Sequence, residues 1–365
     1  MLKIIAFFLV LATLLGVLTG CAGTPVIYMT NCTCPTAAPV VEAPAEEAAP
    51  AEETAPAAAE GAVKTGLYIG ANLADSKSAT AEENGEAKYD VTVVAVAIDD
   101  AGVITDCIID SIPASVTFDA SGAITSDTAA AVQTKNELGE AYGMKAYAGA
   151  KYEWNEQAQA LADYAVGKTV EELKNGAIGE DGKAKDADLA TTATIYLGGY
   201  VSGIEAAAAN AAHHGAQAGD DLRLAILASV SDSAAATAEK AGNAQLNADV
   251  TVLTMNGETI TSCTIDSLQA KVAFDTTGAI TSDVASGAQT KNQLGEAYGM
   301  KAYAGSKYEW NEQAAAFASY VTGKTVADVN GIAVNEKTAP TDADLSSTVT
   351  IAIGGFQALV TKAAQ

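Results

Sequence analysis

The sequence of 365 residues has little positive charge and almost no histidine. It carries 45 acidic side chains against 20 basic ones, and Arg223 is its single arginine. Because nucleic acids and phosphorylated partners are bound through clusters of basic side chains, this composition excludes nucleic-acid binding as the main function. The two histidines, His213 and His214, are neighbours in the chain, which excludes histidine-based triads and histidine-rich metal sites inside a folded domain.

Long apolar runs are also scarce, and the one that exists lies near the amino terminus. Lys3 precedes apolar residues 4–18, and Leu18-Thr19-Gly20-Cys21 follows. This pattern is typical of a secretion signal over residues 1–20, and its ending resembles the lipobox of bacterial lipoproteins, in which Cys21 becomes the lipidated first residue. The alternative is an ordinary signal peptide cleaved elsewhere. Since no later apolar stretch approaches eighteen residues, we expect a lipid anchor on the outer face of the cytoplasmic membrane, with the protein exposed to the cell wall or exterior.

The next segment, residues 21–62, has the composition of a tether. Residues 22–62 hold six of the eight prolines and six glutamates, with no lysine or arginine. Such a segment buries too little apolar surface to offset its ordering entropy, so we expect an extended, disordered spacer. Cys32 and Cys34 lie within it, and the sequence leaves open a local disulfide, a partner thiol or acylation.

After the tether the chain is duplicated. Residues 133–158 recur as residues 289–314 with 24 of 26 positions identical, the exceptions being Glu137/Gln293 and Ala150/Ser306. A period of 156 residues is long enough for each copy to own a core, so it indicates two tandem domains. We place repeat 1 at 63–212, a linker at 213–219 and repeat 2 at 220–365.

Each repeat opens with patterns typical of β-strands. Asn256-Gly257 stands between β-branched runs, which is a strong hairpin signal, and in repeat 1 it predicts that residues 90–98 pair with 103–111. Asp90 to Cys107 spans seventeen residues whereas Asp249 to Cys263 spans fourteen, and we place this difference at the hairpin tip. Cys107 and Cys263 fall in mid-strand, where we expect buried reduced thiols.

Helical patterns follow in each repeat. Apolar residues recur at helical spacing from Trp154 and from Trp310 until Gly167 and Gly323 stop them. We expect capping boxes at Thr169 and Thr325, threonine-rich strands at 191–197 and 347–353, and closing helices after the double glycines that follow those strands. Strands first and helices later predict an α+β fold, each repeat being a mainly antiparallel sheet packed with helices.

The nearly identical segment is the candidate site, because strands and loops around it have diverged. Aromatic side chains alternate there with lysines, which suits a flat ligand stacked on rings and held by a few polar groups. The alternative is a recent duplication that retained a structural corner. The candidate ring-stacking residues are Tyr142, Met144 and Trp154 in repeat 1 and Tyr298, Met300 and Trp310 in repeat 2.

A short motif stands directly before this segment in repeat 2, reading Asp283-Val284-Ala285-Ser286-Gly287-Ala288-Gln289-Thr290. It resembles the flavin-attachment motif of FMN-binding domains, in which a Ser-Gly-Ala turn precedes a threonine that carries FMN through a phosphoester bond. Two departures are present: Gln289 stands where the family's acceptor usually lies, and repeat 1 keeps only Asp127 and the Gln-Thr-Lys. The resemblance implies covalent FMN on Thr134 and Thr290, with Ser286, Gly287 and Ala288 near the phosphate and Lys135 and Lys291 neutralising it.

The layout of lipobox, acidic tether and two repeats resembles the two-flavin lipoproteins of Gram-positive extracellular electron transfer. That resemblance implies a flavin transferase for maturation, a membrane quinol-oxidising electron donor and extracellular acceptors. The protein would be an electron carrier rather than a true enzyme, with no catalytic residue and no metal. The alternatives are a cofactor-free cell-surface lipoprotein with two ligand-binding modules, and a pure spacer or adhesin.

Overall fold

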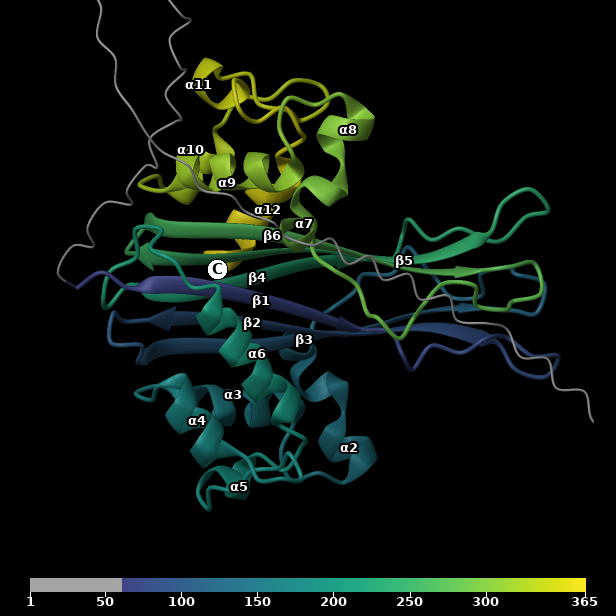
Figure 1. Cartoon of the computed structure of the whole chain (residues 1–365), viewed down its shortest axis with the longest axis horizontal. Helices are drawn as coiled ribbons and strands as arrows, with labels where there is room; N and C mark the ends of the chain where they lie inside the picture. The colour runs from purple at the N-terminus through teal and green to yellow at the C-terminus, as the bar shows by residue number, and fades with distance from the viewer. Residues whose placement is uncertain (1–60) are drawn as a thin grey trace, which may run out of the picture. The chain divides into compact units, whose positions relative to one another are not determined.

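The computed structural model describes residues 61–365 (Figure 1). The expected signal peptide, the lipidation site Cys21 and nearly all of the tether, including Cys32 and Cys34, lie outside these residues. Among the helices of residues 61–365, none has the length and apolar character needed to cross a lipid bilayer.

The two repeats contain the same succession of elements. Repeat 1 consists of β1 (Lys64–Asn72), β2 (Gly85–Ile98), β3 (Ile104–Phe118), α1 (Lys135–Leu138), the 3-10 turn η1 (Gly139–Tyr142), α2 (Met144–Ala148), α3 (Trp154–Ala165), α4 (Val170–Ala177), α5 (Leu189–Thr192) and α6 (Gly198–Ala209). Repeat 2 consists of β4 (Asp221–Ser229), β5 (Gly242–Asn256), β6 (Thr259–Phe274), α7 (Lys291–Leu294), η2 (Gly295–Tyr298), α8 (Met300–Ala304), α9 (Trp310–Val321), α10 (Val326–Asn330), α11 (Ala343–Ser346) and α12 (Gly354–Ala363). The expected α+β fold with antiparallel sheets is confirmed.

Each sheet has three antiparallel strands, in the orders β1-β2-β3 and β4-β5-β6. Successive side chains of β2 point to opposite faces of its sheet, so β2 packs on both sides. Val91 and Val93 face a core shared with the other sheet, whereas Val94 and Val96 face the helices of repeat 1. The molecule therefore has four layers, with the two sheets inside and one set of helices on each outer side, and the strands extend past the helices at one end (Figure 1).

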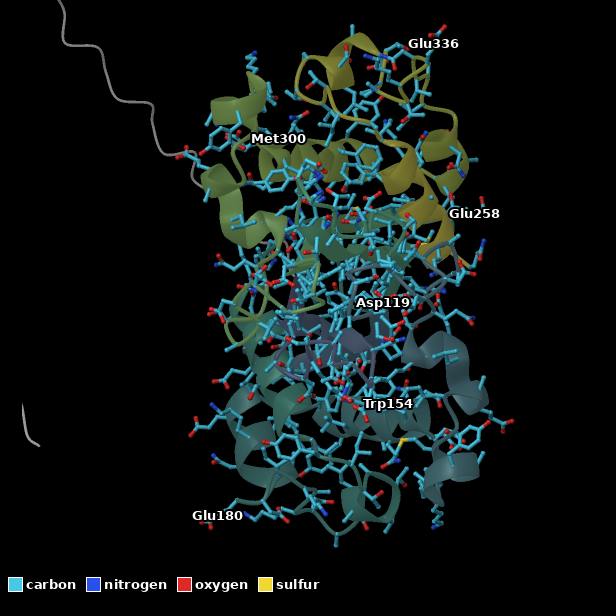
Figure 2. All side chains as sticks on the ribbon, turned by 90° about the vertical axis from the view of Figure 1, so that its right-hand side faces the viewer. Asp119, Trp154, Glu180, Glu258, Met300 and Glu336 are labelled. Atoms are coloured by element: carbon cyan, nitrogen blue, oxygen red, sulfur yellow. The ribbon has the colours of Figure 1, made fainter. Side chains whose placement is uncertain are left out.

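The two sheets join through equivalent positions. The rings of Phe118 and Phe274, which are both fully buried, stack with centroids 4.0 Å apart. Ala71 bridges to Ala288, and the corresponding residues Ala228 and Val132 make the same bridge on the other side. Figure 2 shows Asp119 near the middle of the molecule, with Trp154 in one helical layer and Met300 in the other. The repeats thus pack as a pseudo-twofold pair, an arrangement that the sequence did not predict.

The hairpin is confirmed, but the expected correspondence between the two repeats along its first strand is wrong, and the repeats differ by one residue at the tip and not by three. Asp249 pairs with Ser267, as Thr92 pairs with Ser111, so Thr92 and not Asp90 is the equivalent of Asp249. The residue equivalent to Asp90 is Asn247, since each pairs with the last residue of the first strand in its repeat. The expectation was wrong because Asp90 and Asp249 are both aspartates but lie two positions apart in the aligned repeats.

The expected threonine-rich strands are also wrong. In repeat 1 the backbone N–H groups of Thr194 and Ile195 donate to Oε1 of Gln157, at 2.8 and 3.1 Å. Gln313 makes the same bonds to Thr350 and Ile351 in repeat 2. A buried glutamine side chain therefore satisfies backbone groups that a neighbouring strand would otherwise have paired.

The remaining expectations for helices and cysteines are confirmed. The stripe from Trp154 is the buried face of α3, and α9 repeats it; both helices end two residues before a glycine with positive φ, at Gly167 and Gly323. The capping boxes of α4 and α10 form as expected, and the closing helices α6 and α12 begin at the double glycines themselves. Cys107 and Cys263 are buried and free.

Candidate functional site

The two threonines expected to carry FMN are buried N-caps. Thr134 is 2% exposed and Thr290 is 1% exposed. The Thr134 hydroxyl accepts a hydrogen bond from the backbone N–H of Glu137, whose carboxylate accepts in turn from the backbone N–H of Thr134. Thr290 forms the same reciprocal box with Gln293. Both threonines therefore begin short helices inside the protein, and their hydroxyls act as N-caps.

A buried aspartate lies beneath each of these threonines, and neither aspartate was predicted from the sequence. Oδ1 of Asp110 on β3 accepts from the backbone N–H groups of Ser111 and Asn136, at 2.7 and 3.1 Å. Burial raises the pKa of Asp110 to about 6, against the lowering effect of hydrogen bonds from Thr134, Asn136 and Ser111. Burial likewise raises the pKa of Asp266, the equivalent residue on β6. The Ile-Asp-Ser triplet common to both repeats was the signal that could have found them.

The lysine after each threonine is enclosed by aromatic rings. Nζ of Lys135 lies 5.2 Å from the ring centre of Tyr142 and 5.0 Å from that of Trp154, with a carboxylate oxygen of Asp90 at 3.9 Å. In repeat 2, Nζ of Lys291 lies 5.2 Å from Tyr298 and 4.7 Å from Trp310. Burial lowers the pKa of Lys291, while the charges of Asp249 and Asp266 act in the opposite direction. These ammonium groups are held by cation–π contacts within their own repeat.

A buried polar network accounts for much of the near identity of the two segments. The carboxylate of Glu153 accepts from the backbone N–H groups of Met144 and Lys145, at 2.8 and 3.1 Å, and so caps α2. Gln157, which is fully buried, donates to the carbonyl of Tyr152 and accepts from the loop before α6. Glu309 and Gln313 make the equivalent bonds in repeat 2. Each such side chain satisfies several backbone groups. Few other side chains at the same position could keep all of those groups hydrogen-bonded.

The loop with the flavin-attachment resemblance lies at the junction of the repeats. The carboxylate of Asp283 accepts from the backbone N–H of Ala285 at 2.9 Å and from the hydroxyl of Ser286 at 2.5 Å, and these bonds lower the pKa of Asp283. Gly287 has a φ of +67°, and a Cβ there would lie 2.5 Å from the carbonyl oxygen of Ala71. Ala288 forms the bridge to β1. In repeat 1, Asp127 accepts from the backbone N–H of Ala129 and begins a similar turn.

The expected ring-stacking residues of repeat 1 do come together, in a cleft with a cavity volume of about 450 Å³. The cleft lies on the outer face of the β1-β2-β3 sheet, where the helical layer ends. Tyr142, Met144 and Trp154 line it together with Tyr196 and Tyr200, which the sequence analysis did not select. Its polar lining comprises Asn72, Asp90, Thr92, Ser111 and Lys135.

Repeat 2 differs at the two added tyrosines. The residues equivalent to Tyr196 and Tyr200 are Ala352 and Phe356. In repeat 1 the indole N–H of Trp154 donates to the Tyr200 hydroxyl at 3.0 Å, whereas in repeat 2 Trp310 meets Phe356 edge-on, with centroids 5.9 Å apart. The two repeats therefore share the lysine and its aromatic cage, but they do not share the aromatic wall supplied by the loop before α6.

Compared with models of known protein families, with curated proteins and with solved structures, the chain matches none. The question of FMN therefore rests on the residues themselves. Gln289, at the position where FMN-binding domains usually carry their acceptor, has no hydroxyl, and the hydroxyls of Thr134 and Thr290 are buried at helix starts. As folded here, these residues do not fit a phosphoester on either threonine. Covalent attachment stays a prediction, and the burial weighs against it.

Proposed function

We propose that the chain is a membrane-tethered extracytoplasmic binding protein that holds a flat, ring-containing ligand in the cleft of repeat 1. The observation that supports this function is the gathering of Tyr142, Met144, Trp154, Tyr196 and Tyr200 around one opening. Its volume of about 450 Å³ falls within the range of about 300 to 1,000 Å³ that is usual for small-molecule sites. The membrane tether remains an expectation from the sequence.

The lining of the cleft favours a planar ligand with polar edges. Tyr196 is 63% exposed although it is large and aromatic, so its ring is free to contact a second ring. Lys135 and Asp90 place opposite charges at one end of the cleft, and Ser111 adds a hydroxyl. A heteroaromatic ring bearing hydrogen-bond donors and acceptors matches both features. The isoalloxazine of a flavin belongs to this class and is the first ligand to test.

The experiment is a titration of FMN and of riboflavin with the full chain, in which binding is measured as quenching of the flavin fluorescence. We expect Tyr142→Ala and Tyr196→Ala each to weaken binding by about three- to tenfold, the effect of losing one ring contact. Tyr147→Ala is the matched control, because Tyr147 is 90% exposed and lies outside the cleft. Failure to quench with either flavin, or equal loss in the control, would contradict a flavin-type ligand.

A covalent two-flavin electron carrier is the second candidate. The resemblance of the Ser286-Gly287-Ala288 turn to the attachment motif supports it, and Ser286 is exposed. In that case a flavin transferase would load the chain, and a quinol-oxidising membrane system would supply electrons that the flavins pass to outside acceptors. Coexpression with a transferase and intact mass measurement test it. A mass increase of two FMN minus two water molecules, reduced by one such increment in Thr290→Ala, would favour this candidate over non-covalent binding, and an unchanged mass would remove it.

A further inference from the structure

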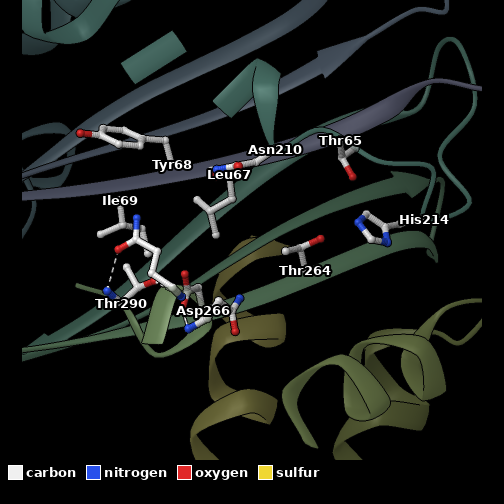
Figure 3. A pocket seen from close by; sticks show the side chains of 11 residues that line it. Thr65, Leu67, Tyr68, Ile69, Asn210, His214, Thr264, Asp266 and Thr290 are labelled. Atoms are coloured by element: carbon white, nitrogen blue, oxygen red, sulfur yellow. Dashed lines mark hydrogen bonds between the residues drawn. The ribbon is translucent and has the colours of Figure 1, made fainter. Parts of the chain in front are cut away.

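A second pocket lies where β1 of repeat 1 meets β6 of repeat 2, and the function proposed above does not use it. Its volume is about 310 Å³. Figure 3 shows Thr65 from β1, Thr264 from β6 and His214 from the linker around one end of it, with Asp266 and Thr290 at the other. The rest of the lining comprises Leu67, Tyr68, Ile69, Asn210, Asn292 and Gln293.

Two hydroxyl groups in this pocket have no partner within residues 61–365. Oγ1 of Thr65 and Oγ1 of Thr264 are both shielded from solvent and make no hydrogen bond there. Thr65 as a whole is 2% exposed. Leaving a buried hydroxyl without a partner is energetically unfavourable, so two of them facing one pocket favour a ligand that pairs with them.

The pseudo-twofold arrangement supplies an internal comparison. On the opposite side of the molecule the position of Thr65 is taken by Leu222 and that of Thr264 by Ile108. Leu222 is a buried member of a small apolar cluster, and Ile108 packs against it. The same framework is therefore closed by apolar side chains on one side and left open with two hydroxyl groups on the other.

The end of the pocket near Thr290 also differs from the equivalent place on the opposite side of the molecule. On the closed side, Nζ of Lys362 donates to the carbonyl of Ile226 at 2.5 Å and forms an ion pair with Glu137. On the open side the equivalent residues are Ile69 and Gln293, and no lysine or arginine lines the pocket. The neutral amide of Gln293 needs no cation, whereas the carboxylate of Glu137 is matched by one.

We propose that this pocket is a binding site for a small neutral polyhydroxylated ligand of monosaccharide size. Hydroxyl groups of a sugar both donate and accept, which is what the free hydroxyls of Thr65 and Thr264 require. The amides of Asn210 and Gln293 and the carboxyl of Asp266 are further partners of the kind that sugars use. An anion is disfavoured, because Asp266 is present and no lysine or arginine is. The volume, at the lower end of the usual range for ligand sites, limits the ligand to about one ring.

The test is ligand-observed saturation-transfer NMR on the full chain, with D-glucose, N-acetylglucosamine and glycerol as separate probes. We expect transfer to at least one sugar, and its loss in the double variant Thr65→Leu/Thr264→Ile. That variant copies the pair that already closes the opposite side, so we expect it to fold, which circular dichroism checks. Should it unfold, Thr264→Val, which removes one hydroxyl and keeps the shape, is expected to reduce the transfer at least threefold.

Two further results separate this site from the cleft of repeat 1. Tyr196→Ala, which alters that cleft, is expected to leave sugar transfer unchanged, and Thr65→Leu/Thr264→Ile is expected to leave flavin titration unchanged. The proposal is overturned if no probe shows transfer, or if transfer persists in a folded double variant. Loss of sugar transfer in Tyr196→Ala alone would assign the sugar to the cleft instead.

Discussion

Phe118 and Phe274 occupy the same position in the two repeats and stack on each other, with ring centroids 4.0 Å apart and planes inclined by 1°. Each ring ends a strand of its own sheet, and each is fully buried. The contact is possible only because a pseudo-twofold axis brings identical positions together. The relation between these two residues is therefore the clearest sign that the sheets share a core, in addition to the core that each repeat forms with its own helices.

The phenylalanine pair gives the first prediction. Phe118→Ala is expected to cost about 3 to 5 kcal/mol in the free energy of unfolding, from lost burial and the cavity left behind. In a double-mutant cycle with Phe274→Ala, we expect a coupling of about 0.5 to 1.5 kcal/mol, measured by urea denaturation. Phe317, a core residue within repeat 2 alone, is the control: a cycle of Phe118→Ala with Phe317→Ala should be additive. Additive behaviour of the stacked pair would contradict direct contact.

The second prediction concerns Gln157, whose side chain satisfies backbone groups on both sides of it. Gln157→Leu leaves three donors without a partner, namely the N–H and hydroxyl of Thr194 and the N–H of Ile195. We expect a loss of about 1 to 3 kcal/mol, because a leucine in place of the fully buried glutamine offers these donors no acceptor. Gln159→Leu on the exposed side of the same helix is the matched control and should change stability by less than about 0.5 kcal/mol. Equal effects of the two variants, measured by thermal and urea unfolding, would show that the network contributes little.

The third prediction is a pH dependence caused by Asp110. Its pKa in the folded protein is about 6, above the value near 3.9 of an unfolded aspartate, so the folded state holds the proton more tightly. The contribution of Asp110 to stability is therefore present below about pH 4 and is lost as the pH rises through 6. Relative to the wild type, Asp110→Asn should become more stable by about 2 to 3 kcal/mol between pH 4 and pH 7.

Urea denaturation at several pH values, applied to wild type and variant together, measures this difference. The shared contribution of all other carboxylates cancels in the comparison. Asp266→Asn should change in the same direction, because burial also raises the pKa of Asp266. A difference between wild type and variant that is constant with pH, or that has the opposite slope, would rule out the burial effect.

The fourth prediction concerns the ion pair between Lys362 and Glu137, which lies on the side of the molecule opposite the second pocket. Lys362→Met leaves the Glu137 carboxylate without its cation, and we expect a loss of about 1 kcal/mol, since both side chains are about one-third exposed. Glu137→Gln, which copies the residue that repeat 2 carries at this position, should restore most of that loss in the double variant. Thermal melting of the four proteins checks the cycle. Absence of rescue would mean that Lys362 acts through its carbonyl contact with Ile226 instead.

Local sequence determined much of the fold. The capping boxes at Thr169 and Thr325, the stripe from Trp154 and the hairpin signal at Asn256-Gly257 each act within a few residues, and each appears where it was expected. The burial of Cys107 and Cys263, which are the fourth residue of β3 and the fifth of β6, followed from the same strand patterns. The gathering of Tyr142, Met144 and Trp154 was also expected, because all three lie within one nearly identical segment.

What the sequence by itself determined is the pair of α+β repeats and the gathering of Tyr142, Met144 and Trp154. Tertiary structure alone decided that the two sheets share a core, that Thr134 and Thr290 are buried, and that Thr65 faces Thr264 across an open pocket. The physical reason is distance along the chain: the shared core and the pocket depend on contacts such as Val132 with Ala228 and Ala71 with Ala288, which are 96 and 217 residues apart and which no local pattern encodes.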